Sequence, residues 1–392
     1  MPQTINTNVT SLTAQRNLNA SQSSLSTSMQ RLSSGLRVNS AKDDAAGLAI
    51  AERMNTQVRG MNVAARNAND GISLAQVAEG ALGKVGDMLQ RMRELAVQAS
   101  NATNSDDDRK ALQAEVSQLR DEINRVAQQT AFNGQKLLDG SFSAATFQIG
   151  ANSGETITVA ALTDSTADGL SKVVYGSDSI TTGTAGAVTT LTEITAGDLA
   201  LTVDGIEYEL SAIGEARTGE ERMGQIVEAI NRRTADTGVA AFLKAETDGT
   251  YSLEVRSSKL DASGDAVAVT AGGFSLATTG FSAADLSIAS GSATSAVGID
   301  EMSIETAEDA WLAIKQVDDA LNQINEARAT LGAVQSRFEN AVSNIQIQSE
   351  NTSAARGRIM DADFAAETAN LSRAQILQQA GTAMVAQANQ LP

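Results

Sequence analysis

Apolar residues occur near the N-terminus at the spacing of one helix face. They repeat every seven positions, with a companion row at alternating spacings of four and three: Leu18, Leu25, Leu32, Met29 and Leu36. These spacings place the side chains on one narrow stripe, the pattern by which one helix meets another. The sequence therefore predicts a first helix that pairs along this stripe and is interrupted at 32–40.

The helical pattern resumes beyond residue 40 and continues to about residue 98. Ser40, with Asp43 three residues later, is predicted to cap the start of this second helix. Nearly sixty residues of helix would span roughly 85–90 Å at a rise of about 1.5 Å per residue. That length exceeds what a globular domain needs.

A polar turn at 101–108 separates the second helix from a third. Within it, Ser105 and Asp108 have the spacing of another capping pair. The apolar positions of the third helix are Leu112, Val116, Leu119, Ile123 and Val126. We predict that this helix folds back antiparallel on the second.

The C-terminal third carries the same kind of pattern. A heptad seam holds across Val317, Leu321, Ile324, Leu331, Val334, Phe338, Val342 and Ile345. We predict a break near Arg356 and Gly357. The last helix then carries Phe364, Leu371, Ile376, Leu377, Ala380 and Met384. The order of helix pair, insertion and helix pair predicts that the two ends of the chain meet.

The middle of the chain has a different pattern, since residues 151–300 hold 18 of the 31 glycines. Residues 200–210 alternate around Asp204-Gly205, which favours a tight hairpin turn. A helix is predicted at 219–233, and 239–255 alternates again around Asp248-Gly249. Hairpin, helix and hairpin together predict a small α+β unit at about 197–258.

Composition limits the chemistry that this chain can perform. Cysteine and histidine are absent, which removes disulfides, thiol chemistry, imidazole bases and the usual zinc sites. Neighbouring carboxylates such as Glu220 and Glu221 fit a solvated surface or the start of a helix. No phosphate-binding loop occurs. We therefore expect no enzyme, no catalytic or metal-binding residues and no cofactor.

Charge and hydropathy limit the partners. The net charge is −18, and residues 151–300 carry 21 acidic against 8 basic residues, a net of −13. This acidic middle favours a solvated outer surface and argues against a nucleic-acid partner. No apolar run is long enough for a membrane span. The start has no basic segment followed by an apolar one, so we expect no cleavable secretory signal.

The predicted fold is multidomain and mainly α. Both termini form a long antiparallel helical bundle or coiled coil, with an inserted α+β, strand-rich outer domain. The seams at 41–130 and 310–345 have partners within the chain and are expected to hold the subunit together. The stripes at 1–36 and 359–392 are too thin to form a core alone. We expect those ends to be disordered in the monomer and ordered by neighbouring subunits.

Both ends contain sequences that resemble a known family. The N-terminal segments are Asn6-Thr-Asn-Val9, Ser11-Leu-Thr-Ala-Gln-Arg-Asn-Leu18 and Leu32-Ser-Ser-Gly-Leu-Arg-Val-Asn-Ser-Ala-Lys-Asp-Asp-Ala-Ala-Gly-Leu-Ala-Ile50. The C-terminal segments are Ile359-Met-Asp-Ala-Asp-Phe-Ala-Ala-Glu-Thr-Ala-Asn-Leu371 and Gln375-Ile-Leu-Gln-Gln-Ala-Gly381. They closely resemble the two terminal regions of bacterial flagellin. The unit at 197–258 resembles, more weakly, a motif inserted in some flagellins and hook-associated proteins.

The resemblance implies a division into three domains. Residues 1–40 with 355–392 would be the inner helix pair that lines the filament channel. Residues 41–160 with 300–354 would be the surrounding helical domain, and 161–299 would be the surface-exposed insertion.

The resemblance also implies a structural subunit that polymerises into the flagellar filament for motility and is located outside the cell. It would be exported unfolded by the flagellar type III route. Its partners would be other copies of the chain, a filament cap, hook–filament junction proteins and an export chaperone. The Ser- and Thr-rich middle could carry O-linked sugars, as in many flagellins.

The resemblance further implies recognition by a Toll-like receptor of animal hosts. The receptor-binding pattern occurs here as Gln90-Arg91-Met92-Arg93-Glu94-Leu95-Ala96-Val97-Gln98. Arg91 and Leu95 would be central contacts, with Glu115 as a third, beside Gln90, Arg93 and Glu94. The other interpretation is that this face is buried against adjacent subunits, and both interpretations hold together if sensing requires the monomer.

Two other functions remain open from the sequence. A hook–filament junction protein would share the terminal helices but would not form long polymers. A secreted adhesin would act through the middle domain.

Overall fold

The computed structural model describes residues 8–183, 185–246, 250–282, 286–289 and 297–388. The chain divides into two compact units. Unit 1 comprises Met1–Ser73, Thr146–Val159 and Val334–Pro392, and unit 2 comprises Leu74–Ala145 and Ala160–Ala333. Two helices, α2 (Ala45–Ala99) and α7 (Ala307–Met360), contribute to both. The mainly α fold with a strand-rich insertion is confirmed.

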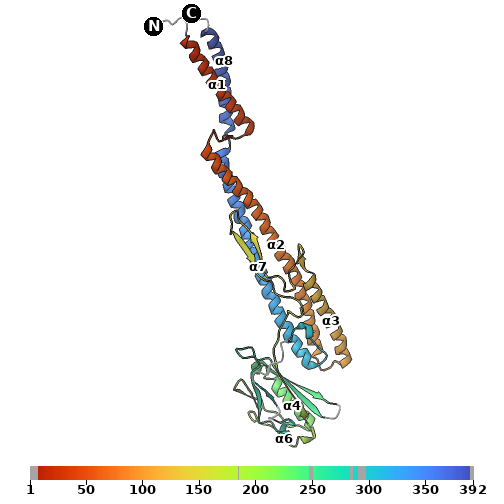
Figure 1. Ribbon diagram of the computed structural model, residues 1–392. Coiled ribbons are helices and arrows are strands. Elements are labelled where there is room, and N and C mark those ends of the chain that lie inside the picture. The colour runs from red at the N-terminus through yellow and green to blue at the C-terminus, as the bar shows by residue number, and fades with distance from the viewer. Residues whose placement is uncertain (1–7, 184, 247–249, 283–285, 290–296, 389–392) are drawn as a thin grey trace. The chain divides into compact units, whose positions relative to one another are not determined.

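In unit 1 the two ends of the chain meet as an antiparallel helix pair, α1 (Val9–Ser34) and α8 (Phe364–Ala388) (Figure 1). The side chain of Asn8 caps α1 by accepting a hydrogen bond from the Ser11 amide at 3.0 Å. Gly35 ends α1 in the left-handed conformation, with φ 72°, and its amide donates to Arg31. The prediction that the two ends meet is confirmed.

The predicted cap of the second helix is wrong by one turn. Asp43 does accept hydrogen bonds from the Ser40 amide and hydroxyl, but these close a separate turn before the helix. Asp44 is the residue that caps α2, because its carboxylate accepts from the Gly47 amide at 2.7 Å. The hydrogen bonds from Ser40 lower the pKa of Asp43.

The predicted break before the last helix is present, but it lies at 361–363, because α7 continues through Arg356 and Gly357. The Arg356 guanidinium donates to the side chain of Asn55 on α2 at 2.9 Å, so a tertiary contact supports the helix where glycine weakens it. The helix ends three residues later, and Asp363 caps α8 by accepting from the amides of Ala365 and Ala366.

A two-stranded hairpin packs on the helices of unit 1. Its strands are β3 (Ala145–Gln148) and β4 (Thr156–Val159). Phe147 on β3 meets Phe338 on α7 edge to face, with ring centroids 5.5 Å apart. Phe338 is fully buried and lies over Gly71 of α2, where an added Cβ would come 2.7 Å from the ring. Gly71 thus allows the close approach of α2 and the Phe338 ring.

We expect Gly71→Ala to be destabilising although alanine favours helices. The propensity gain is about 1 kcal/mol, whereas forcing a fixed ring to move costs roughly 1–3 kcal/mol. Gly80→Ala on the same helix is the matched control, since nothing lies within 4 Å of its Cβ position. Thermal unfolding should show Gly80→Ala more stable than wild type and Gly71→Ala less stable. Equal shifts in the two variants would contradict the packing role.

The helical part of unit 2 is built on α2, α7 and α3 (Asp106–Gln129), followed by the short hairpin β1 (Ala131–Phe132) and β2 (Gln135–Lys136). The predicted cap of α3 is confirmed, because the Ser105 hydroxyl accepts from the Asp108 amide and Asp108 accepts from Ser105. The Asp108 carboxylate accepts hydrogen bonds from the Ser105 hydroxyl and from the Ser105 amide, and these two bonds lower the pKa of Asp108. Five residues of the predicted seams are buried here: Val116, Ile123, Val317, Ile324 and Leu331. Apolar residues of α2 are buried in the same region: Leu82, Val85, Leu89 and Met92.

The strand-rich insertion of unit 2 contains two sheets. The first has the order β11 (Ser287–Ile288), β10 (Val269–Gly272), β6 (Ala200–Val203), β7 (Ile206–Glu209). The second has the order β5 (Gly176–Gly183), β9 (Tyr251–Ser257), β8 (Val239–Ala245). The helical elements are α4 (Gly219–Asn231), α5 (Thr234–Thr237), α6 (Leu276–Thr279) and the 3₁₀ turns Ala185–Ala187 and Ile299–Glu301.

The hairpin, helix and hairpin predicted for the middle are present. Asp204 and Gly205 have φ values of 57° and 74°, as a tight turn between β6 and β7 requires. The second predicted turn, at Asp248-Gly249, lies outside the described residues. The two hairpins belong to different sheets, and β5, β10 and β11, which the sequence analysis did not identify, complete those sheets.

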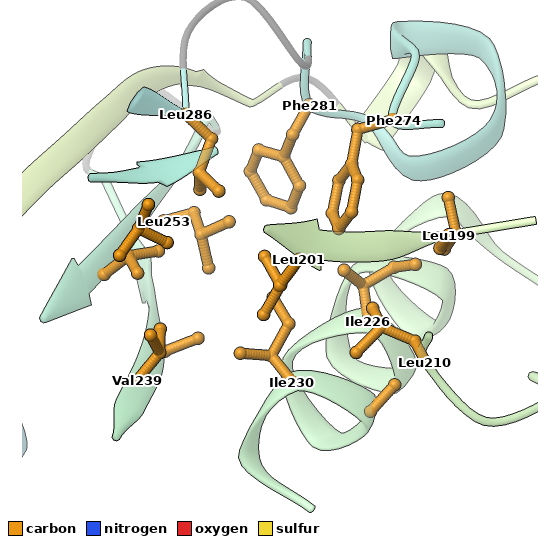
Figure 2. Close-up of a cluster of buried hydrophobic side chains, with 14 of the residues drawn as sticks. Leu199, Leu201, Leu210, Ile226, Ile230, Val239, Leu253, Phe274, Phe281 and Leu286 are labelled. Carbon is orange, nitrogen blue, oxygen red and sulfur yellow. The ribbon is translucent and has the colours of Figure 1, made fainter. Parts of the chain in front are cut away.

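One apolar core joins the two sheets and α4 (Figure 2). Leu201 of β6, Ile226 and Ile230 of α4 and Leu253 of β9 point toward one another in its centre. Phe274 and Phe281, which flank α6, close one side. The insertion therefore has a core of its own, with residues drawn from between Ile180 and Ile288.

Candidate assembly and recognition surfaces

The terminal residues predicted to carry assembly fall into two groups. Leu18, Leu25 and Leu32 of α1 and Leu371 of α8 are partly buried. Leu18 touches α8 at Gly381, where an added Cβ would lie 3.1 Å from the leucine side chain. These leucines are therefore the part of the predicted α1 stripe that packs toward α8, whereas Met29 of the companion row is exposed.

The second group is exposed on the described surface. Met29, Phe364, Ile376, Leu377 and Met384 are between 51% and 67% exposed. Val9 and Leu12, which the sequence analysis did not select, belong with them. We call these seven residues the exposed apolar set. The sequence signals these residues only in one way. They are large apolar residues in terminal helices that have too few apolar partners within the chain to bury them.

The exposed apolar set does not lie on one stripe of α8, in contrast to the single thin stripe predicted there. Ile376 and Leu377 are consecutive, hence about 100° apart around the helix, and both are exposed. A helix that is apolar on several sides is typical of one surrounded by other helices. The arrangement on α8 therefore needs neighbours on more than one side.

Packing between α1 and α8 is thin. The well-buried described residues of the pair are small or polar: Ser11, Ser28, Glu367 and Ala374. An open cleft of about 480 Å³ lies between the helices, lined by residues that include Ser28, Arg31 and Leu377. Arg31 reaches Glu367 at 3.9 Å, but its buried Nε atom has no hydrogen-bond partner. Little apolar area holds this pair together by itself.

The predicted recognition residues come together on the surface of unit 2. Arg91 Nε donates to Glu115 Oε1 of α3 at 2.9 Å, and its Nη1 donates to Glu94 Oε2 at 2.9 Å. The pKa of Arg91 is raised by the hydrogen bond with Glu115 and by that with Glu94. Gln90 lies exposed beside them. Three of the six predicted residues thus form one ion-paired cluster.

Arg93 belongs to a different contact. Its Nε donates to Asp318 Oδ1 of α7 at 2.7 Å, and this bond raises the pKa of Arg93. The two arginines of the motif therefore connect α2 to different helices: Arg91 contacts α3 and Arg93 contacts α7. Asp318 was not predicted, because an ion pair between segments 225 positions apart leaves no local signal.

Leu95 is the one predicted recognition residue whose position disagrees with the expectation. Its side chain is fully buried with Met92 and Ala96, so it is not an exposed contact of the subunit. The alternation of buried and exposed positions along α2 places Leu95 on the face that packs inward. Its role within the described chain is to support the helix that presents Arg91.

Exposed apolar side chains on thinly packed helices define a class of protein that completes its core by self-association. Among the described helices, none combines the length and apolar character that a membrane span requires.

Comparison with known proteins identifies the family. Residues 5–143 match the bacterial flagellin N-terminal helical region, and residues 314–392 match the bacterial flagellin C-terminal helical region. The B-type flagellin of Pseudomonas aeruginosa is 37% identical over 100% of this chain and 98% of its own length. Flagellin A of Vibrio anguillarum is 42% identical over 99% of this chain and 97% of its own. The chain therefore belongs to the bacterial flagellin family, whose members are structural subunits of the flagellar filament rather than enzymes.

Solved structures were also compared. FliC from Burkholderia pseudomallei is 26% identical, with a TM-score of 0.39 over 68% of this chain and 99% of that one. The flagellar junction protein FlgL from Legionella pneumophila is 16% identical, with a TM-score of 0.43 over 79% of this chain and 99% of that one.

Proposed function

We propose that this flagellin polymerises through the helices at its two ends. The observation that carries the proposal is the exposed apolar set on α1 and α8. Burying each such side chain against a neighbour contributes roughly 1.5–3 kcal/mol. A few of them therefore supply enough free energy for association once several subunits meet.

The same proposal assigns the parts of the chain in the filament. Residues 1–40 with 355–392 form the inner domain, 41–160 with 300–354 form the surrounding domain, and 161–299 face the solvent. Head-to-tail contacts whose rotation does not close give a helix rather than a ring. The acidic composition of 151–300 supports a solvated position for the insertion.

Seeded growth tests this proposal and separates it from the hook–filament junction alternative. Purified chain added to short filament fragments should elongate them into long filaments, as seen by electron microscopy. A junction protein would cap the fragments and stop. Failure to elongate any fragment under conditions where a known flagellin grows would overturn the proposal.

Export and delivery are part of the proposed function. The chain would leave the cell unfolded through the flagellar type III route, held beforehand by a chaperone, and would add to the filament beneath a cap protein. The thin packing of α1 on α8 supports this, because a helix pair with little buried apolar area is easily kept unfolded.

Recognition by a host Toll-like receptor would use the Arg91 cluster. We expect Arg91→Ala to lower receptor activation about tenfold or more, since a central arginine is a common hot spot. If this face also packs against adjacent subunits, the same change removes a contact between subunits, so assembly should weaken. Reporter-cell activation by purified monomer measures the first effect, and seeded elongation measures the second.

Arg125→Ala is the matched control for the Arg91 experiment. Arg125 is an exposed arginine on α3 that pairs with Glu122 one turn away. Its loss should leave both readouts near wild type. Wild-type signalling by the Arg91→Ala monomer would rule out the cluster as the receptor contact.

A further inference from the structure

The central strand of the second sheet presents two different faces. Leu253 and Val255 of β9 point into the core of the insertion. Because side chains alternate along a strand, Glu254 and Arg256 lie on the opposite face. Phe242 of β8 pairs with Glu254 across the strands and lies on that same face. The sheet therefore has a second face, with its own polar and aromatic residues.

Arg256 connects this second face to the start of α7. Its Nη1 donates to the backbone oxygen of Glu308 at 2.7 Å, and its Nη2 donates to Asp309 Oδ1 at 3.2 Å. The guanidinium also lies 5.6 Å from the ring centre of Tyr175. Although it is charged, the side chain is only 8% exposed. One arginine therefore makes three contacts outside its own strand.

An aromatic contact lies beside the arginine. Phe242 meets Trp311 of α7, with ring centroids 6.5 Å apart and planes at 65°. Trp311 is the only tryptophan of the chain. The ammonium group of Lys315, one turn further along α7, lies over the Trp311 ring, 5.9 Å from the ring centre. The second face of the sheet is thus docked on the first two turns of α7.

The hydrogen-bond acceptors of Arg256 belong to two different elements, the strand β9 and the helix α7. Glu254 accepts from Arg256 Nε at 2.7 Å and belongs to the same strand, so it stays with the arginine if the sheet leaves α7. Asp309 and the Glu308 carbonyl belong to α7 and would be lost. Opening would therefore not leave an unpaired buried charge, which is the usual large cost of breaking such a contact.

We propose that Arg256 is a releasable latch that docks the strand-rich insertion onto the first turns of α7. With the latch closed, the insertion is held in one orientation on the helices. With it open, the insertion keeps its own core and is tethered only by its connecting segments. Loss of the α7 contacts should therefore free the insertion without unfolding it.

Trp311 fluorescence in the full-length monomer tests the latch. Arg256→Met keeps most of the side-chain length but removes the donors. We expect a red-shifted Trp311 emission and a rise of about twofold in acrylamide quenching, as local opening exposes the ring. Asp309→Asn, which leaves Glu254 in place, should change both readouts in the same direction by a smaller amount.

Arg233→Met is the matched control, since Arg233 is exposed and pairs with Asp236 within the insertion. It should leave Trp311 unchanged. Hydrogen exchange of β6 and α4 amides should stay protected in all three variants. Unchanged quenching in Arg256→Met would overturn the latch. Loss of protection in β6 and α4 would overturn it equally, because Arg256 would then be needed for the fold of the insertion rather than for its docking.

Discussion

A chain that lacks residues 1–36 and 359–392 should remain folded and soluble but should no longer grow filaments. These segments contain every residue of the exposed apolar set. The remaining chain keeps the buried contacts that hold each unit, such as Phe338 in unit 1 and Leu89, Met92 and Ile324 in unit 2. Circular dichroism should show cooperative unfolding, and seeded fragments should not elongate. Filament growth by this truncation would show that the helices at 41–130 and 310–345 suffice for assembly without the terminal helices.

A single substitution sharpens the same test. Ile376 is 66% exposed, so Ile376→Asp should barely change the stability of the monomer. In the filament it would replace a buried apolar side chain by a charge, and a loss of about 3 kcal/mol corresponds to a critical concentration roughly a hundredfold higher. Ile376→Leu keeps the apolar surface and is the control. If Ile376→Asp assembles like Ile376→Leu, then Ile376 stays exposed in the filament.

Features set by neighbouring residues were predictable from the sequence. The Ser105–Asp108 cap and the Asp204-Gly205 turn each depend on residues within four positions of one another. The seam of Leu18, Leu25 and Leu32 follows from spacing alone. The cap of the second helix was mispredicted because several neighbouring residues can act as a cap. Ser40, Asp43 and Asp44 all have suitable side chains, and the helix begins after Asp44.

Features that depend on distant segments were not predictable. Arg356 and Gly357 look like a break until the contact with Asn55 is known. The strands β5, β10 and β11 show no strong alternation. They are strands because partners lie beside them: β9 for β5, β6 for β10, and β10 for β11. The partners of Arg93 and Arg256 lie 225 and 53 positions away. The candidate assembly residues could be identified because the signal is local. Leucine, isoleucine and phenylalanine in the terminal helices are recognised by residue type and spacing, without knowledge of a partner segment in the chain.

Replacement of Arg222 should lower the stability of the insertion more than replacement of any exposed residue. This α4 arginine is fully buried, and its guanidinium donates to the backbone oxygens of Gly214, Leu191 and Thr192. Burial lowers the pKa of Arg222. The bonds connect two loops to the start of α4, beside the bridge between Ile194 and Ile213.

We expect Arg222→Met to destabilise the insertion by about 3 kcal/mol or more, because three backbone carbonyl groups lose the same buried charged donor together. Hydrogen exchange of the β6 amides, which lie in the core beside α4, measures the loss as faster exchange at fixed pH. Arg232→Met is the control, since Arg232 is an exposed arginine that pairs with Glu228 one turn away and should contribute under about 1 kcal/mol. Because the exposed apolar set lies outside the insertion, seeded elongation by Arg222→Met should stay near wild type. If the β6 amides of Arg222→Met are as well protected from exchange as those of Arg232→Met, then the loops keep their positions without Arg222.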